Sequence, residues 1–211
     1  MSGIHDLALF IAAGLLLNLT PGPDMTYIAA RAVAGGFRDG AAATFGITAG
    51  SVVHTIAAAA GLSALLATSA TAFEIVKWCG ALYLLYAGIR LLRDGRGEGG
   101  VAQPSLRAAR PRAIFREALV INVFNPKVAL FFLAFVPQFI DRDAPGKAAA
   151  FVLLGALFNF NSLFVNVPVA WLASRSARRW RASERAAQWL RRVTGGLFVL
   201  VAARLAALSR D

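Results

Sequence analysis

Long apolar segments alternate with short, arginine-rich stretches along this sequence. A helix that crosses a bilayer needs about 20 mostly apolar residues. Six segments reach that length, at residues 7–30, 40–66, 70–92, 114–140, 148–174 and 190–208. The boundary between the second and third is the least defined, because residues 40–73 carry no charge at all. The pattern predicts an all-α, polytopic membrane protein with six transmembrane helices.

Composition agrees with a membrane location. Of the 211 residues 58% are hydrophobic and 16% are charged, and the mean hydropathy is +0.61, which exceeds the apolar share of a soluble domain. Residues 1–6 contain an acid but no Lys or Arg, so we expect the first segment to be retained rather than cleaved as a secretory signal. The net charge of +11 comes with no nucleic-acid motif, and a single cysteine excludes a Cys-based metal cluster. We therefore expect a lipid bilayer but no nucleic acid or metal as a partner.

The basic residues are distributed unevenly between the loops. Sixteen of the 22 follow the first, third and fifth segments: Arg31, Arg38, Arg90, Arg93, Arg96, Arg107, Arg110, Arg112, Arg116, Arg175, Arg178, Arg179, Arg181, Arg185, Arg191 and Arg192. Cytoplasmic loops carry an excess of Lys and Arg. We predict that these loops are cytoplasmic and that both termini are periplasmic, in a multi-pass protein of the bacterial inner membrane.

A glycine-rich linker divides the chain. Residues 95–112 contain the run Arg-Gly-Glu-Gly-Gly and a proline, which is typical of a flexible connection. It separates residues 1–94 from residues 113–211, and each part contains three of the predicted segments. Because three is odd, the two parts must have opposite orientations. We expect one transmembrane domain built from two inverted three-helix repeats, with the first and fourth helices broken.

The first break lies within residues 7–30 and consists of Asn18, Pro21, Gly22, Pro23 and Asp24. Proline removes a backbone donor, so the break frees carbonyl groups that lipid cannot satisfy. Broken helices at membrane depth line cavities, and an ionisable group there is a candidate functional residue. Asp24 is that group. The alternative left open is a simple kink, with Asp24 capping the next turn at the headgroup level.

The second break occupies the corresponding segment of the second half and consists of Asn122, Asn125, Pro126 and Lys127. Paired proline interruptions at matching positions indicate a transporter binding site. Lys127 lies ten residues from the nearest cytoplasmic charge, Glu117, and ten helical residues span roughly 15 Å, about half the hydrocarbon core. Lys127 therefore requires a counter-charge, and we expect Asp24 to face it.

Small residues recur every four positions in the second segment. Ala42, Gly46, Gly50, His54 and Ala58 form this row, and such spacing lets helix backbones approach closely. We predict that Gly46 and Gly50 are helix-packing residues and that His54 faces protein. The sequence leaves open whether His54 is a hydrogen-bonding partner or a proton carrier.

Several of these motifs occur together in a known family. They are Pro21-Gly22-Pro23-Asp24-Met25, Val53-His54-Thr55, Tyr83-Leu84-Leu85-Tyr86-Ala87-Gly88, Asn125-Pro126-Lys127-Val128-Ala129-Leu130-Phe131-Phe132 and Phe135-Val136-Pro137-Gln138-Phe139. In content and order the chain resembles the LysE/RhtB family of amino-acid exporters. The resemblance implies export of amino acids or their derivatives, driven by the proton motive force, with no nucleotide, metal or other cofactor.

These observations favour a secondary exporter over three alternatives. Asp24 would hold the substrate ammonium or the coupling proton, and Lys127 would hold the carboxylate. An enzyme is disfavoured because the sequence has no zinc-site spacing, carboxylate pair or nucleophile elbow. A membrane scaffold would bury two charges without using them. An exporter of another small metabolite or ion stays open, as do the identity of the amino acid and the oligomeric state, a homodimer included.

Overall fold

The computed structural model describes residues 3–62, 109–141 and 144–175, together with single residues and short runs in the rest of the chain. The latter are residues 71, 75, 78, 82, 85, 86, 88, 89, 92, 93, 188, 189, 192–196, 199, 200, 202 and 203. Every element within this part is helical. Most of the third and sixth predicted segments, and residues 95–108 of the predicted linker, lie outside the described residues.

The first predicted segment is broken where its prolines lie. Helix α1 (Leu7–Leu19) ends before Thr20, the backbone is extended at Thr20 and Gly22, and helix α2 begins at Pro23. With 13 residues, α1 is about 20 Å long, which is too short to cross a bilayer alone. Proline suits the first position of a helix, where its missing N–H has no intrahelical partner to lose.

Helix α2 (Pro23–Ala57) doubles back on itself at Gly36. This residue has a φ of 75° and a ψ of −172°, in a region that residues with a side chain rarely adopt. A Cβ atom on Gly40 would lie 2.6 Å from the Cβ of Ala32, although eight residues of straight helix span about 12 Å. The first segment thus continues past residue 30, and a glycine replaces the longer loop expected between residues 30 and 40. A short π-helix, η1 (Ala58–Leu62), follows.

The second break has a similar construction. Helix α5 (Pro111–Val123) ends, the chain turns at Phe124 and Asn125, and helix α6 (Pro126–Leu130) begins with a proline. It continues as a π-helix, η2 (Phe131–Phe135), and a 3₁₀-helix, η3 (Val136–Phe139). The two sides of the break meet at 49°. Because α5 begins at Pro111, the last two residues of the expected linker belong to this helix.

Helix α7 (Lys147–Arg175) is continuous and exceeds the predicted fifth segment by one residue at each end. Judged by length and hydropathy, α7 and the stretch Pro23–Gly61, which reverses at Gly36, are candidate membrane spans, and the bent pair at the second break is a third candidate. The described elements therefore fit an all-helical membrane protein. The predicted number of six transmembrane segments depends on residues outside them.

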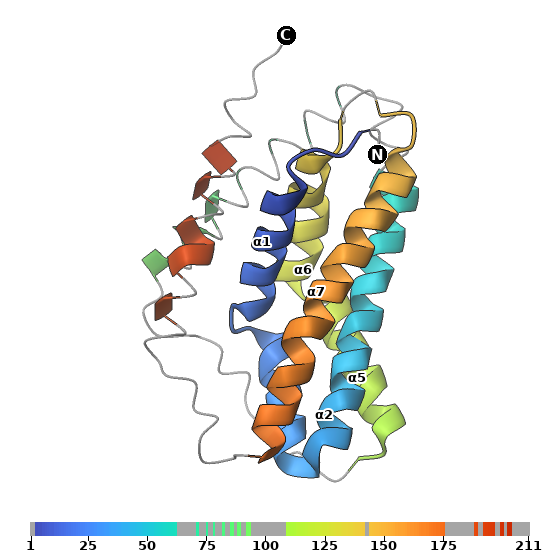
Figure 1. The fold of residues 1–211 in the computed structure, drawn as a ribbon, viewed down its shortest axis with the longest axis vertical. Coiled ribbons are helices and arrows are strands. Elements are labelled where there is room, and N and C mark those ends of the chain that lie inside the picture. The colour runs from blue at the N-terminus through green and yellow to red at the C-terminus, as the bar shows by residue number, and fades with distance from the viewer. Residues whose placement is uncertain are drawn as a thin grey trace.

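The helices run side by side along the long axis of the molecule (Figure 1). Helix α2 packs against both α5 and α7, and α1 packs against α7. Two glycines let α2 approach α5 closely: a Cβ on Gly50 would lie 2.7 Å from the Cβ of Asn122, and one on Gly46 would overlap the carbonyl of Phe115. The row of small residues in the second segment is therefore turned toward α5.

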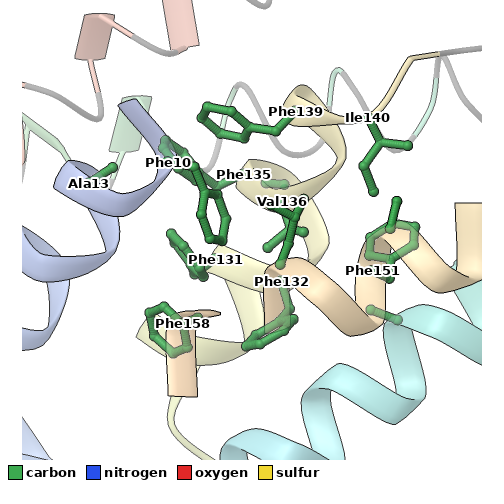
Figure 2. Close-up of a cluster of buried hydrophobic side chains, with 14 of the residues drawn as sticks. Phe10, Ala13, Phe131, Phe132, Phe135, Val136, Phe139, Ile140, Phe151 and Phe158 are labelled. Atoms are coloured by element: carbon green, nitrogen blue, oxygen red, sulfur yellow. The ribbon is translucent and has the colours of Figure 1, made fainter. Parts of the chain in front are cut away.

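Two apolar clusters fill the interior. The phenylalanine cluster joins α1, η2, η3 and α7. Its rings are stacked, tilted or edge-to-face, and the centroids of the stacked pair Phe131 and Phe158 lie 4.5 Å apart (Figure 2). The alanine-rich cluster lies nearer the Gly36 turn and includes Ile28, Ala32, Ile47, Ile114 and Ala170. The polar residues of the two breaks lie between these clusters.

Candidate functional site

A small cavity lies where the two breaks meet. Its walls come from five helices: Leu17 and Asn18 of α1, Asp24, Met25 and Ser51 of α2, Asn122 of α5, Lys127 and Val128 of α6, and Phe158, Ser162 and Asn166 of α7. The space that the centre of a water molecule can occupy is about 10 Å³, which suffices for about one water. The structure therefore holds a closed form of this cavity.

Asp24 is held by the second break. Its side chain belongs to the first turn of the broken helix and is only 8% exposed. Its Oδ2 accepts a hydrogen bond from Asn122 Nδ2 at 2.8 Å, whereas its Oδ1 is buried and has no hydrogen-bond partner among the residues that the structure describes. A buried carboxylate is costly unless its oxygens are paired. One oxygen of Asp24 is thus left available to a ligand.

Lys127 closes the end of α1. Its Nζ donates to the carbonyl oxygens of Leu17 at 3.1 Å and Thr20 at 3.2 Å. In a continuous helix the carbonyl of Leu17 would accept from residue 21, but Pro21 has no N–H. The carbonyl end of a helix also carries partial negative charge, which favours a cation. Because an ammonium has three N–H donors, one remains for a ligand.

We expected Asp24 to face Lys127 as its counter-charge. The two residues line the same cavity, but no direct ion pair joins them. Asn122 holds the carboxylate and the carbonyls of the first break hold the ammonium. The two charges are therefore each supported from the opposite break. This arrangement leaves both of them partly unsatisfied.

The other predicted residues support the breaks rather than line the cavity, apart from Asn18 and Asn122. Asn125 caps α6, its Oδ1 accepting from the backbone N–H of Lys127 at 2.9 Å. A Cβ on Gly22 would lie 3.4 Å from Lys127 Nζ, which is an ordinary van der Waals contact, so Gly22 lies directly beside the lysine. His54 contacts the carbonyl oxygen of Asn122 through Nε2 at 3.2 Å and stacks on Phe132. Pro21, Pro23 and Pro126 interrupt the helices.

Unpartnered polar atoms are concentrated at the cavity. Among the described residues, six buried side-chain atoms have no hydrogen-bond partner, and four of them belong to residues that line it: Asn18 Nδ2, Asp24 Oδ1, Ser51 Oγ and Asn122 Oδ1. Buried polar groups are nearly always paired, so such a concentration indicates a ligand site. The set offers a negative charge, a positive charge, donors and acceptors within one small volume.

A second polar network joins the two halves of the chain, between the cavity and the Gly36 turn. Arg31 donates from Nη2 to Glu117 Oε2 at 2.6 Å and from Nε to the Tyr27 hydroxyl at 3.0 Å, and that hydroxyl donates to Glu117 Oε2 at 2.6 Å. Arg31 lies seven residues after Asp24, on the same face of α2. This network was not predicted from the sequence, although a charge seven residues after Asp24 was a usable signal.

Sequence reasoning also missed Ser51, Phe158, Ser162 and Asn166 as cavity residues. Of these, Asn166 donates to Ser162 Oγ at 3.0 Å within α7. A serine or phenylalanine on an apolar helix carries no sign of function by itself. No group of three or more potential ligands for a metal ion occurs in the described part of the chain.

The sequence of this protein matches known transporters along nearly its whole length. The model of the family described as LysE type translocator matches residues 15–209. The homoserine/homoserine lactone efflux proteins of Salmonella typhi and Salmonella typhimurium are each 32% identical over 198 residues, covering 93% of this chain and 94% of theirs. The leucine efflux protein of an Enterobacter species is 29% identical over 211 residues, covering 98% and 97%. No solved structure matches.

Proposed function

Because this chain belongs to the LysE type translocator family, whose members are membrane transporters and not enzymes, we propose that it is a secondary transporter that exports neutral amino acids or their derivatives from the cytoplasm. Amino-acid export follows from the relatives, which are named as efflux proteins for homoserine and leucine.

One observation carries the site assignment. The unpartnered atoms of the cavity are complementary to the two ends of an amino acid. The substrate ammonium would donate to Asp24 Oδ1 and Asn122 Oδ1. The carboxylate, or the carbonyl of a lactone, would accept from the third N–H of Lys127 and from Asn18 Nδ2. Apart from the contact with Lys127, each of these contacts satisfies a buried atom that has no partner among the described residues, so binding would replace an existing energetic cost.

Transport requires this cavity to open, because it has room for about one water and an amino acid is several times larger. The two breaks are the natural places for that movement. Each lacks continuous helical hydrogen bonds, and the two are joined by side-chain hydrogen bonds, from Asn122 to Asp24 and from Lys127 to the carbonyls of the first break. We propose that loading separates these contacts on one side of the membrane and that release separates them on the other.

The distribution of charge suggests how the protein is oriented in the membrane. Arg112, Arg116 and Arg175 belong to the start of α5 and the end of α7, at the same end of the molecule as the Gly36 turn (Figure 1). The opposite end carries Ile4, which pairs with Ile140. By the positive-inside rule we propose that the arginine-rich end is cytoplasmic and both termini are periplasmic, within six spans arranged as two inverted repeats.

We also propose that export is coupled to protons through Asp24. When the substrate leaves, its ammonium no longer compensates the buried carboxylate, and a proton is the simplest replacement. Lys127 remains compensated by the carbonyls of Leu17 and Thr20. The proton would then return with Asp24 to the cytoplasmic side, where the next substrate ammonium displaces it.

A counterflow screen tests the proposed function. Purified protein in liposomes preloaded with unlabelled amino acids should take up labelled homoserine, threonine or leucine. Asp24→Asn and Lys127→Met should abolish uptake, while Asp141→Asn and Lys147→Met, at the opposite end from the arginine-rich loops, should not. Absence of counterflow with every amino acid, from protein that remains monodisperse and folded, would support the scaffold or the other-solute alternative instead.

A further inference from the structure

Ser51 differs from every other hydroxyl residue described on the second part of α2. Thr44, Thr48 and Thr55 each donate to the carbonyl oxygen four residues earlier, all at 3.0 Å. This is the usual arrangement of Ser and Thr inside a helix, because it satisfies the hydroxyl locally. Ser51 is 1% exposed, yet its Oγ has no hydrogen-bond partner within the described part of the chain. Its hydroxyl is therefore a buried polar group that the helix does not satisfy.

The hydroxyl of Ser51 lies at the cavity. Ser51 is one of the residues that line it, together with Asp24 and Asn122. The neighbouring Gly50 brings this turn of α2 against α5, since a Cβ there would meet Asn122 at 2.7 Å. The close packing of the two helices thus places Ser51 at the wall of the site rather than in an ordinary helix interface.

The other polar groups of the cavity are either assigned to the two ends of the substrate or hydrogen-bonded to each other. Under the proposed function, the two charged residues with Asn18 and Asn122 hold the two ends of the amino acid. The other hydroxyl of the lining, Ser162, accepts a hydrogen bond from Asn166. The rest of the lining is apolar and consists of Leu17, Met25, Val128 and Phe158. A substrate side chain would therefore meet apolar walls and one unpartnered hydroxyl, that of Ser51.

We propose that Ser51 is a specificity-determining residue, whose hydroxyl forms a hydrogen bond with a hydroxyl group on the substrate side chain. The inference rests on the proposed function and narrows its substrate class to amino acids with small hydroxylated side chains. An aliphatic side chain of equal size would fill the same space but leave the Ser51 hydroxyl buried without a partner. Sites built to bind a substrate hydroxyl discriminate against the analogue that lacks it for this reason.

The test compares isosteric amino acids that differ by a hydroxyl or a methyl group. Three pairs cover different positions of the hydroxyl: serine with 2-aminobutyrate, threonine with valine, and homoserine with norvaline. Initial counterflow rates at low substrate concentration give the ratio of kcat/KM within each pair. For the unmodified protein we expect at least one pair to favour the hydroxylated member by about tenfold or more, as expected for a single buried hydrogen bond.

Ser51→Ala should lower that preference about tenfold and leave the rate for the aliphatic member unchanged or higher. Thr48→Ala is the matched control, because it removes a hydroxyl that already bonds to its own helix, and it should leave the ratio unchanged. Ser51→Cys, which nearly retains the volume, guards against a folding defect and should lower the ratio in the same direction.

Three results would overturn the inference: no preference in the unmodified protein, no change of the ratio in either Ser51 variant, or an equal loss for both members of a pair. The last would assign Ser51 to binding of the ammonium or carboxylate end. None of the three results would contradict amino-acid export itself, which is contradicted only if no amino acid is exchanged at all.

Discussion

Asn122 donates a hydrogen bond from its side-chain nitrogen to Oδ2 of Asp24 over 2.8 Å, and this contact joins the second helix break to the first. The two residues come from opposite halves of the chain, 98 positions apart. The contact compensates part of a buried negative charge, and it must separate whenever the two breaks move apart. It therefore links the stability of the closed form to the site proposed for the substrate.

Replacing Asn122 should destabilise the closed form. Asn122→Ala removes a hydrogen bond to a charged group, which contributes about 1.5–3 kcal/mol, and Asn122→Asp should cost more because it places a second carboxylate beside Asp24. Thermal unfolding of the purified protein in detergent measures both. Asn161→Ala is the control, since it loses only a longer bond to the backbone of Ile11 at 3.3 Å. Equal unfolding temperatures for the Ala and Asp variants at position 122 would contradict this reasoning.

Gly50→Ala should lower both stability and transport. The new Cβ would lie 2.7 Å from the Cβ of Asn122, so Asn122 must move and its bond to Asp24 must lengthen. Overpacking of this kind costs about 1–3 kcal/mol. Gly61→Ala is the matched control on the same chain segment, because no atom lies within 4 Å of its added Cβ. If Gly50→Ala unfolds at the same temperature as Gly61→Ala, the two helices are not as closely packed as described.

Replacing Arg31 and replacing Glu117 should cost different amounts of stability, although the two side chains form one ion pair. Arg31 is 7% exposed, whereas the Glu117 side chain is 44% exposed. Glu117→Gln removes the charge that faces a buried guanidinium, while Arg31→Met leaves a carboxylate that water can reach. We expect the first to cost more, by about 1–2 kcal/mol after allowing for solvent screening. The double variant should lose less than the sum of the single losses, and additive losses would show that the two side chains are not coupled.

Topology provides a test of the proposed orientation. Cysteines introduced at Arg38 and Arg112, with Cys79 replaced by serine, should be protected from membrane-impermeant reagents in intact cells. A cysteine at Asp141 should be labelled, because it lies at the opposite end of the molecule. Labelling of the first two and protection of the third would show the opposite orientation in the membrane and contradict the proposed one.

The sequence was most informative where a residue conflicts with its surroundings. Prolines and charges are anomalous in apolar helices, so both breaks, Asp24 and Lys127 could be identified from local rules. That these charges share a cavity was predicted, but their indirect support was not. Whether Lys127 contacts Asp24 or the carbonyl of Leu17 depends on how the broken ends are oriented in space.

Other features left little trace in the sequence. The reversal of α2 depends on the positive φ of Gly36, and the only local sign was the pair Gly35-Gly36 among helix-forming residues. Ser51 and Phe158 are ordinary residues for an apolar helix, and only the packing of α2 and α7 around the breaks turns them toward the cavity. The number of spans and the repeat symmetry depend on the third and sixth segments, most of which lie outside the described residues.

The central claim is that the cavity binds both ends of an amino acid, and competition by substrate analogues tests it most directly. Counterflow of a labelled substrate should be inhibited by the unlabelled amino acid, but far less by its N-acetyl derivative or by the amine without the carboxyl group. Each analogue loses the contacts of one end of the amino acid, with Asp24 or with Lys127, so we predict an affinity loss of at least about 30-fold. Inhibition by either analogue at the concentration that suffices for the parent amino acid would contradict the account.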